Sequence, residues 1–268
     1  MKTFKVDKEQ KLSKFLNAKY GALMPYSTFM KLLRNKDIKI NGFRVSKDVS
    51  LSVGDDVIVY FDGKKEVYKP IYSNAKILVF NKPPTITSED FEVIINKDYI
   101  GAKLCHRLDR NTSGLLVFAT DETAYTEMLS AFKKRSIDKF YKAEVYGKLS
   151  NKKGVLTSYL VKDSENSIVK IYDKEVINST KIITEYEVIE ELSETSIVKV
   201  KLITGKTHQI RAHLAHIGHF IVGDNKYGDV EINKKLKAQR QKLTAYKIAF
   251  NFEPNSPLYS LNKEIIEI

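Results

Sequence analysis

The chain has 268 residues, of which 43% are hydrophobic and 29% are charged. This balance is typical of a globular protein with a sizeable core and excludes a disordered chain. The formal net charge of +12 favours a polyanionic partner, because a basic surface gains affinity when it displaces counterions from phosphates.

The sequence contains no apolar run as long as a membrane span, and its start lacks the apolar region of a signal peptide. We therefore expect a cytoplasmic protein with no membrane partner. Cys105 is the single cysteine, which excludes an intramolecular disulfide and fits a reducing compartment.

The first 62 residues predict a small unit of two helices and several strands. Apolar residues recur at helical spacing from Leu12 to Tyr20, and Gly21 provides a stop signal. Ser27 is a candidate N-cap for a second helix. Asn41-Gly42 favours a two-residue hairpin turn. The strands expected around and after this turn lie within 38–40, 43–45 and 53–61.

This unit carries 12 Lys and Arg against 7 Asp and Glu, a net charge of +5. Its order of elements and its segments 12–16 and 34–42 resemble the S4 RNA-binding domain. The resemblance implies that basic residues of the second helix and the following loop contact the RNA backbone, namely Lys31, Arg34 and Lys36. The alternative is a small helical module whose Lys and Arg face is only solvated.

A second domain is predicted over residues 71–268. Residues 63–70 are polar and charged and include a proline, so we expect a linker there. A strand is predicted over 76–80, and it ends at Asn81-Lys82-Pro83-Pro84, because two prolines prevent continued pairing. Lys82 is a candidate contact to an RNA phosphate, and a solvated loop lysine is the alternative.

The segment 105–119 reads Cys-His-Arg-Leu-Asp-Arg-Asn-Thr-Ser-Gly-Leu-Leu-Val-Phe-Ala. An acid between two arginines is followed by a turn sequence and an apolar strand. The guanidinium groups of Arg107 and Arg110 favour the ionised form of Asp109, whereas burial against the strand opposes it. The alternative is a turn aspartate in a surface ion pair. We interpret Cys105 as a small core residue.

This segment resembles the active-site motif of the RluA-type pseudouridine synthases. The resemblance implies that Asp109 is the catalytic residue and that Arg107 occupies the space left by a flipped base. Arg110 is then a contact to the RNA backbone or a phosphate. In the same family a strand followed by Asn-Lys-Pro opens the catalytic domain, as residues 81–83 do here.

A helix is predicted over 121–135, and its apolar stripe is assigned to core packing. The following strand, 139–147, alternates and places Tyr141 on one face. Tyr141 fits the family motif Lys-x-Tyr-x-Ala, whose tyrosine stacks on the target base. Without the resemblance, core packing is the alternative. Several β-branched runs between 154 and 200 predict strands whose order cannot be inferred.

The segment 203–224 follows a predicted strand, 197–203, and continues at helical spacing. It matches the family pattern Thr-Gly-Arg-Thr-His-Gln-Ile-Arg-x-His-Leu, followed by Gly-His-x-Ile-x-Gly-Asp. The match implies that Arg211 pairs with Asp109 and that Lys206 and His208 contact RNA. Lys206 replaces a frequent arginine, which keeps the charge but loses the planar fork.

Two other interpretations of this segment are disfavoured. Gly205-Lys206-Thr207 imitates a phosphate-binding loop, but the first glycine of that pattern is replaced by Val200. Four of the five histidines cluster here, yet only His213 and His216 share a helix face, and no HExxH motif or cysteine ligand accompanies them. A metal-dependent hydrolase therefore stays a minor alternative. A closing strand is expected over 243–250.

Together the motifs imply an α+β fold, with a mixed, largely antiparallel sheet and flanking helices, preceded by a small α/β S4-like domain. The implied reaction is isomerisation of uridine to pseudouridine in RNA without cofactor or metal. Large-subunit ribosomal RNA is the first candidate substrate and transfer RNA the second, and we expect a monomer. The alternative is a non-catalytic RNA-binding or ribosome-assembly factor, which the set Asp109, Tyr141 and Arg211 disfavours.

Overall fold

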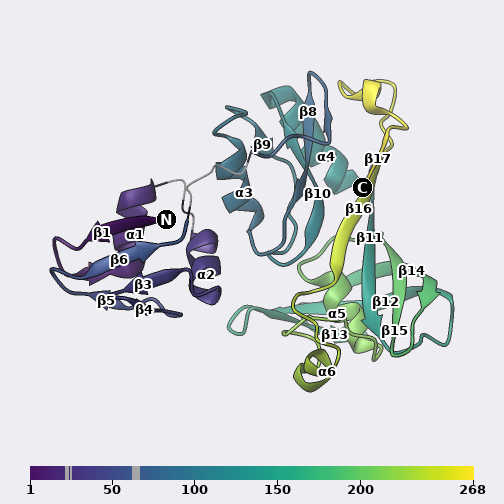
Figure 1. Ribbon diagram of the computed structural model, residues 1–268. Helices are drawn as coiled ribbons and strands as arrows, with labels where there is room; N and C mark the ends of the chain where they lie inside the picture. Colours follow the sequence, from purple (N-terminus) through teal and green to yellow (C-terminus); the bar gives the residue numbers. More distant parts are fainter. Residues whose placement is uncertain (22–23, 25, 62–66) are drawn as a thin grey trace. The chain divides into compact units, whose positions relative to one another are not determined.

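The structure, a computed structural model, describes residues 1–21, 24, 26–61 and 67–268. The chain divides into two compact units, Met1–Tyr68 and Lys69–Ile268 (Figure 1). The domain end predicted at residue 62 and the predicted linker overlap residues 62–66, which lie outside the described residues. No helix in the described ranges is long and apolar enough to cross a membrane.

The first unit packs two helices on a four-stranded antiparallel sheet of order β1-β6-β3-β4. Its core joins Phe15 and Leu16 of the first helix and Leu33 of the second to Ile38 and Val57 of the sheet. The remaining strands, β2 and β5, pair with each other. The elements are β1 (Lys2–Lys5), β2 (Gln10–Lys11), α1 (Leu12–Tyr20), α2 (Tyr26–Arg34), β3 (Ile38–Ile40), β4 (Phe43–Arg44), β5 (Ser50–Leu51) and β6 (Asp56–Val59).

Two of the three turn and cap predictions for this unit are confirmed. The α1 helix ends at Tyr20, and Gly21 follows with a φ of 53°, as predicted. Asn41 and Gly42 join β3 to β4 with φ of 50° and 85°, the positive values that a type I′ hairpin needs. The prediction for Ser27 is wrong, because α2 begins at Tyr26 and an N-cap must precede the first helical residue.

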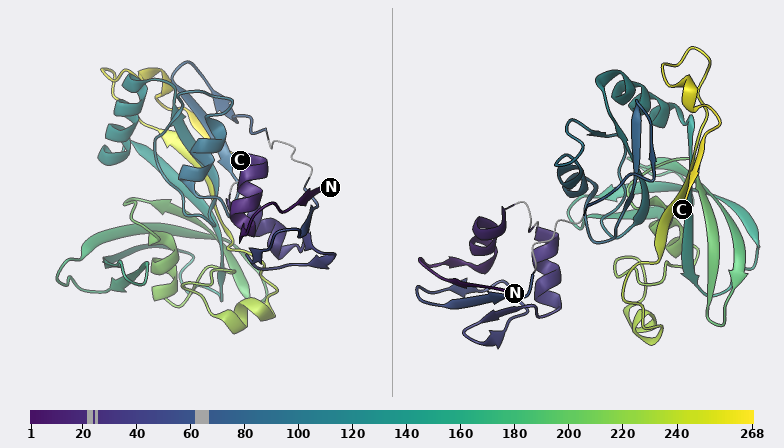
Figure 2. Two further views of the ribbon diagram at one scale, coloured as in Figure 1. Left: turned by 90° about the vertical axis from the view of Figure 1, so that its left-hand side faces the viewer. Right: turned by 45° about the horizontal axis from the view of Figure 1, so that its top comes forward.

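One large sheet organises the second unit (Figure 2). Its strand order is β13-β12-β14-β15-β11-β16-β10-β8-β7, with β9 paired to β10 and β17 to β16. The strands are β7 (Tyr72–Ser73), β8 (Ile77–Lys82), β9 (Lys103–Leu104), β10 (Ser113–Ala119), β11 (Ile137–Tyr146), β12 (Lys153–Asp163), β13 (Ile168–Tyr172), β14 (Thr180–Glu191), β15 (Thr195–Leu202), β16 (Leu243–Phe250) and β17 (Ile265–Glu267). All neighbouring pairs are antiparallel except β10 and β16, so the predicted α+β class and largely antiparallel sheet are confirmed.

Helices cover the two halves of this sheet separately. On one half, Ala124 and Met128 of α4 pack with Val117 of β10. On the other half, Ala212 of α5 packs with Ile182 of β14. The strands β11 and β16 lie between these halves. The helices are α3 (Ser88–Ile95), α4 (Glu122–Lys134), α5 (Gln209–His216) and α6 (Val230–Lys235), with a short 3-10 helix at Tyr259–Leu261.

The strand expected to close the sheet, β16, is instead one of its central strands. It lies between β10 and β11, and Gly114 of β10 pairs in parallel with Ala245. Gly114 has a φ of 117°, and a Cβ on it would lie 2.2 Å from the Ala245 carbonyl oxygen. The glycine after Thr112-Ser113 is therefore required for the two strands to approach.

Candidate active site

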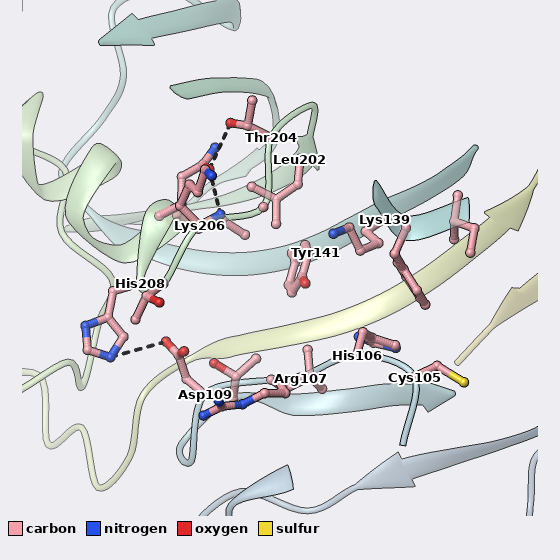
Figure 3. A pocket seen from close by; sticks show the side chains of 18 of the residues that line it. Cys105, His106, Arg107, Asp109, Lys139, Tyr141, Leu202, Thr204, Lys206 and His208 are labelled. Atoms are coloured by element: carbon pink, nitrogen blue, oxygen red, sulfur yellow. Dashed lines mark hydrogen bonds and ion pairs between the residues drawn. The ribbon is translucent and has the colours of Figure 1, made fainter. Parts of the chain in front are cut away.

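A cleft of about 1300 Å³ opens in the second unit between the loop before β10, strand β11 and the segment before α5 (Figure 3). Side chains from positions about 100 residues apart in sequence face one another across it. Seven residues singled out from the sequence line it, namely Arg107, Asp109, Arg110, Tyr141, Lys206, His208 and Arg211.

Asp109 lies in a loop whose backbone is fixed on both sides. The Ser88 hydroxyl donates to the Leu108 carbonyl (3.0 Å) and accepts from the Leu108 N–H (2.9 Å). On the other side, the Thr85 N–H donates to the Arg110 carbonyl (2.8 Å). The Asp109 carboxylate therefore projects from a held backbone, and its side chain is 25% exposed in the cleft.

Lys82 supports the same loop from inside, so the predicted phosphate contact is wrong. The side chain is fully buried, and its Nζ donates to the carbonyls of Pro83 and Ile86 (both 2.9 Å) and Arg110 (3.2 Å). Burial lowers the pKa of Lys82 to about 8, although the Asp109 charge opposes this shift. An ammonium enclosed by three carbonyls is not available to RNA.

Arg211 joins Asp109 to a second carboxylate. Its Nη1 lies 2.9 Å from Asp109 Oδ2, the pairing that the motif match implies. Its Nε and Nη2 donate to the two oxygens of Asp224, at 2.6 and 3.0 Å. Burial alone would lower the pKa of Arg211, but the hydrogen bonds and charges of the two carboxylates outweigh it and raise that pKa. Burial alone would likewise raise the pKa of Asp224, but Arg211 holds it low.

Asp224 is a site residue for which the sequence analysis predicts no role. It is 1% exposed, and its Oδ1 also accepts from the N–H of Lys226 (2.9 Å). Its signal was present, because it ends the segment 203–224 as the last residue of the matched Gly-Asp pair. A buried acid so close to a motif arginine indicates an ion pair, but the motif match pairs that arginine with Asp109.

His208 and Tyr227 complete this side of the cleft. His208 precedes α5 in the left-handed conformation (φ 54°), with its Nε2 3.9 Å from Asp109 Oδ2. Its Nδ1 hydrogen-bonds with the Tyr227 hydroxyl (2.8 Å), and the Arg211 guanidinium lies 5.1 Å from the Tyr227 ring centre. Burial lowers the pKa of His208, which the Asp109 charge opposes. Tyr227 carried no signal in the sequence.

Tyr141 faces the acid from β11. The ring is 6% exposed, and burial followed by the Asp109 charge raises the pKa of its phenol, so the phenol is neutral. Figure 3 shows the ring directed into the cleft from β11, across from the strand that follows Asp109. A neutral aromatic face beside charged side chains in a cleft is typical of a surface on which a nucleic-acid base stacks.

Three predicted RNA contacts lie at the rim with exposed side chains, namely Arg107, Arg110 and Lys206. Arg107 Nε lies 2.8 Å from Glu89 Oε1, and the two side chains are 75% and 52% exposed. Such an exposed pair contributes about 0–1 kcal/mol and separates readily. The Lys206 backbone is held by the Gln209 side chain, which accepts from its N–H at 3.1 Å.

The clustered histidines have separate hydrogen-bond partners. His213 is fully buried between Thr184 and Ser158 (3.0 and 3.2 Å), and burial lowers its pKa to about 4. His216 pairs with an exposed aspartate, and His219 with a backbone carbonyl. Within the part of the chain that the structure describes, no three His, Cys, Asp or Glu side chains are grouped to hold a metal ion.

Comparison with known proteins shows which family contains this chain. The model of a family described as RNA pseudouridylate synthase matches residues 76–216, more than half of the chain. The chain belongs to the RNA pseudouridylate synthase family. The matched range contains Asp109, Tyr141 and Arg211 but ends before Asp224. The protein is therefore an isomerase that converts uridine to pseudouridine in RNA.

Similar proteins and structures agree with this assignment. Ribosomal large subunit pseudouridine synthase C of Vibrio vulnificus is 30% identical over 233 residues, covering 77% of this synthase and 73% of that protein. An uncharacterised RNA pseudouridine synthase of Mycoplasma genitalium is 29% identical over 283 residues, covering 92% and 87%. The structure of human RNA pseudouridylate synthase domain containing 1 is 25% identical with a TM-score of 0.63, covering 78% and 91%.

Proposed function

We propose that this synthase modifies large-subunit ribosomal RNA and that Asp109 is its catalytic carboxylate. The observation that carries the proposal is the Asp109 carboxylate, paired with Arg211 at 2.9 Å and lying in one cleft with Tyr141. The names of similar proteins support the ribosomal substrate, since ribosomal large subunit pseudouridine synthases C and D from two bacteria are each 30% identical.

Access to the target uridine is the first requirement. A base stacked in an RNA helix must leave its stack, at a cost of a few kcal/mol. Arg107 lies at the rim in an exposed ion pair, so we assign it to fill the vacated space. The Tyr141 ring then receives the flipped base, while Arg110, Lys206 and His208 contact the surrounding RNA.

The chemistry requires an ionised carboxylate beside the ribose. The reaction breaks the bond between C1′ and N1, turns the base and joins C1′ to C5, with no net oxidation or hydrolysis. Asp109 acts as a nucleophile at the sugar or as a base toward the ribose, and both routes use its charged form. Arg211, itself fixed by Asp224, supplies the opposite charge that burial of Asp109 demands.

We also propose that the first unit is an S4-like RNA-binding domain. The side chains of Lys31, Arg34 and Lys36 are exposed along the last turn of α2 and just after it, as that role requires. The first 62 residues, which include them, carry a net charge of +5. The monomeric state and the cytoplasmic location stay predictions.

Mapping pseudouridines in total RNA from cells with and without the gene tests the substrate. We expect one or more large-subunit ribosomal sites to be missing in the deletion strain and restored by the wild-type gene but not by Asp109→Asn. Unchanged ribosomal RNA, with a missing transfer RNA site instead, would contradict the ribosomal assignment.

A further inference from the structure

Lys139 occupies the inner part of the cleft without a counter-charge. It lies two residues before Tyr141 on β11, so both side chains share the cleft face of the strand. Among the described residues, no oxygen accepts a hydrogen bond from its Nζ and no carboxylate pairs with it. Its Nζ lies 5.6 Å from the centre of the Phe132 ring. Burial lowers the pKa of this ammonium.

Two groups that lie near Lys139, His106 and Tyr141, are uncharged. His106 is neutral, because burial and then the Lys139 charge lower its pKa to about 3. The Tyr141 phenol is neutral as well, since burial raises its pKa. The ammonium lies against the backbone of Gly205, where an added Cβ would be only 2.9 Å from Nζ. The residues around Lys139 thus accommodate its ammonium group but do not neutralise its charge.

Two other lysines of the second unit, one buried and one half-buried, have acceptors. Lys82 has three carbonyl oxygens, and half-buried Lys201 pairs with Asp138 at 3.0 Å. Lys139 is only partly buried, and its ammonium has no such acceptor among the described residues, so it is available to donate to a ligand in the cleft. Unlike these two lysines, Lys139 lines the cleft in which the proposed reaction takes place.

We infer that Lys139 is a further catalytic residue, whose ammonium contacts a carbonyl oxygen of the target uracil and balances the charge of the detached base. The inference rests on the proposed isomerisation at Asp109. In the close view, Tyr141 is drawn between Asp109 and Lys139, so a base on its ring has the acid on one side and the ammonium on the other (Figure 3).

The reaction creates a charge that this ammonium can stabilise. When the C1′–N1 bond breaks, the electron pair stays on the base and spreads over N1 and the two carbonyl oxygens. When C1′ joins C5, that pair forms the new bond, C5 loses its proton and N1 gains one. A fixed cation at a carbonyl oxygen stabilises the anion more than the neutral base, which lowers the barrier. An ammonium is also a donor only, so it favours a uracil carbonyl over a cytosine amino group.

The test measures single-turnover rates on total RNA from a strain that lacks the gene. Lys139→Met, which keeps the length and removes the charge, is expected to lower the rate about 10²–10³-fold, the usual effect of losing one preorganised stabilising group. RNA affinity stays unchanged. The melting temperature is expected to stay close to that of the wild type, because no described protein group accepts a hydrogen bond from this ammonium.

Chemical rescue separates the effect of the charge at position 139 from the effect of the side-chain shape. In the Lys139→Cys variant, 2-bromoethylamine rebuilds a side chain of lysine length with an ammonium, whereas bromoethane adds a similar tail without it. Wild-type protein treated identically is the control for Cys105, which is buried with its thiol pKa raised to about 12 and so stays unreactive. We expect recovery of the rate only after treatment with 2-bromoethylamine.

Three outcomes would overturn the inference: a wild-type rate for Lys139→Met, equal recovery with both reagents, or a loss of RNA affinity at an unchanged rate, which would assign the ammonium to a backbone phosphate. Total RNA contains every candidate substrate, so the result does not depend on which RNA is modified. If the wild-type protein forms no pseudouridine in the same experiment, the proposed function itself fails.

Discussion

At the scale of single residues, the geometry of the Asp109–Arg211 ion pair depends on a third residue, Asp224. Two hydrogen bonds from Arg211 to Asp224, which is 1% exposed, fix the plane of the guanidinium. One remaining nitrogen then points to Asp109. The bidentate contact explains why arginine, with its rigid fork, stands at this position rather than lysine.

Arg211→Ala is expected to reduce both turnover and stability. The change leaves Asp224 buried without its partner, which costs about 3–5 kcal/mol of unfolding free energy. Arg211→Lys is the control, because it keeps the charge without the planar fork. Its turnover and stability should lie between those of the wild type and those of Arg211→Ala. Urea unfolding and pseudouridine formation are the measurements. Wild-type turnover in Arg211→Ala would show that the pair has no part in catalysis.

The sequence predicted Asp109, Tyr141 and Arg211 as one site, and they line one cleft. The sequence did not predict the environment of residues that contact distant parts of the chain. Lys82 beside two prolines looks like a surface lysine, yet three carbonyls enclose it. Tyr227 reaches the site through a loop between α5 and α6, and no local pattern marks that contact.

At the scale of elements, local patterns predicted the helices α1, α2, α4 and α5 and many of the strands, but not α3, α6 or the order of strands in the sheet. The β16 strand contacts β10 in parallel across 131 residues of sequence, with Ser113 Oγ 2.9 Å from Thr244 Oγ1. A C-terminal strand gives no sign in its own sequence that it inserts between two others. The place of β16 in the sheet depends on its pairing with strands that are distant in sequence.

Gly114→Ala tests the close approach of β10 and β16. The added Cβ meets the Ala245 backbone at 2.2 Å, and the φ of 117° is strained for alanine. Such backbone strain costs about 1–3 kcal/mol by itself, and the clash adds to it. Gly218→Ala is the matched control, since its φ is 84° but no atom lies within 4 Å of the added Cβ. Equal melting temperatures for the two variants would contradict the role assigned to Gly114.

At the scale of the whole molecule, the net charge of +12 fits an enzyme whose substrate is a polyanion. The basic first unit lies outside the matched family range, which begins at residue 76. The proposal that this unit binds RNA is therefore supported by its own basic residues and not by the family match. Charge alone predicted the class of partner, but it cannot specify which uridine is modified.

Replacing Lys31, Arg34 and Lys36 together by alanine should weaken RNA binding and its salt dependence. Each lost phosphate contact lowers the slope of log affinity against log salt by about 0.7–0.9, so three contacts reduce it by about 2. The control removes the same charge elsewhere in the unit, at Lys8, Lys11 and Lys47. Equal slopes for the two triple variants, measured by filter binding, would argue against an RNA-binding surface on α2.

The most direct test of the account is the turnover of purified Asp109→Asn. The change keeps the shape of the side chain and removes its charge, while Arg211 stays paired with Asp224. We predict normal folding, RNA affinity at least equal to that of the wild type, and no detectable pseudouridine formation. Mass spectrometry of the variant verifies that the asparagine is intact. Substantial turnover by the intact variant would contradict the central role of Asp109.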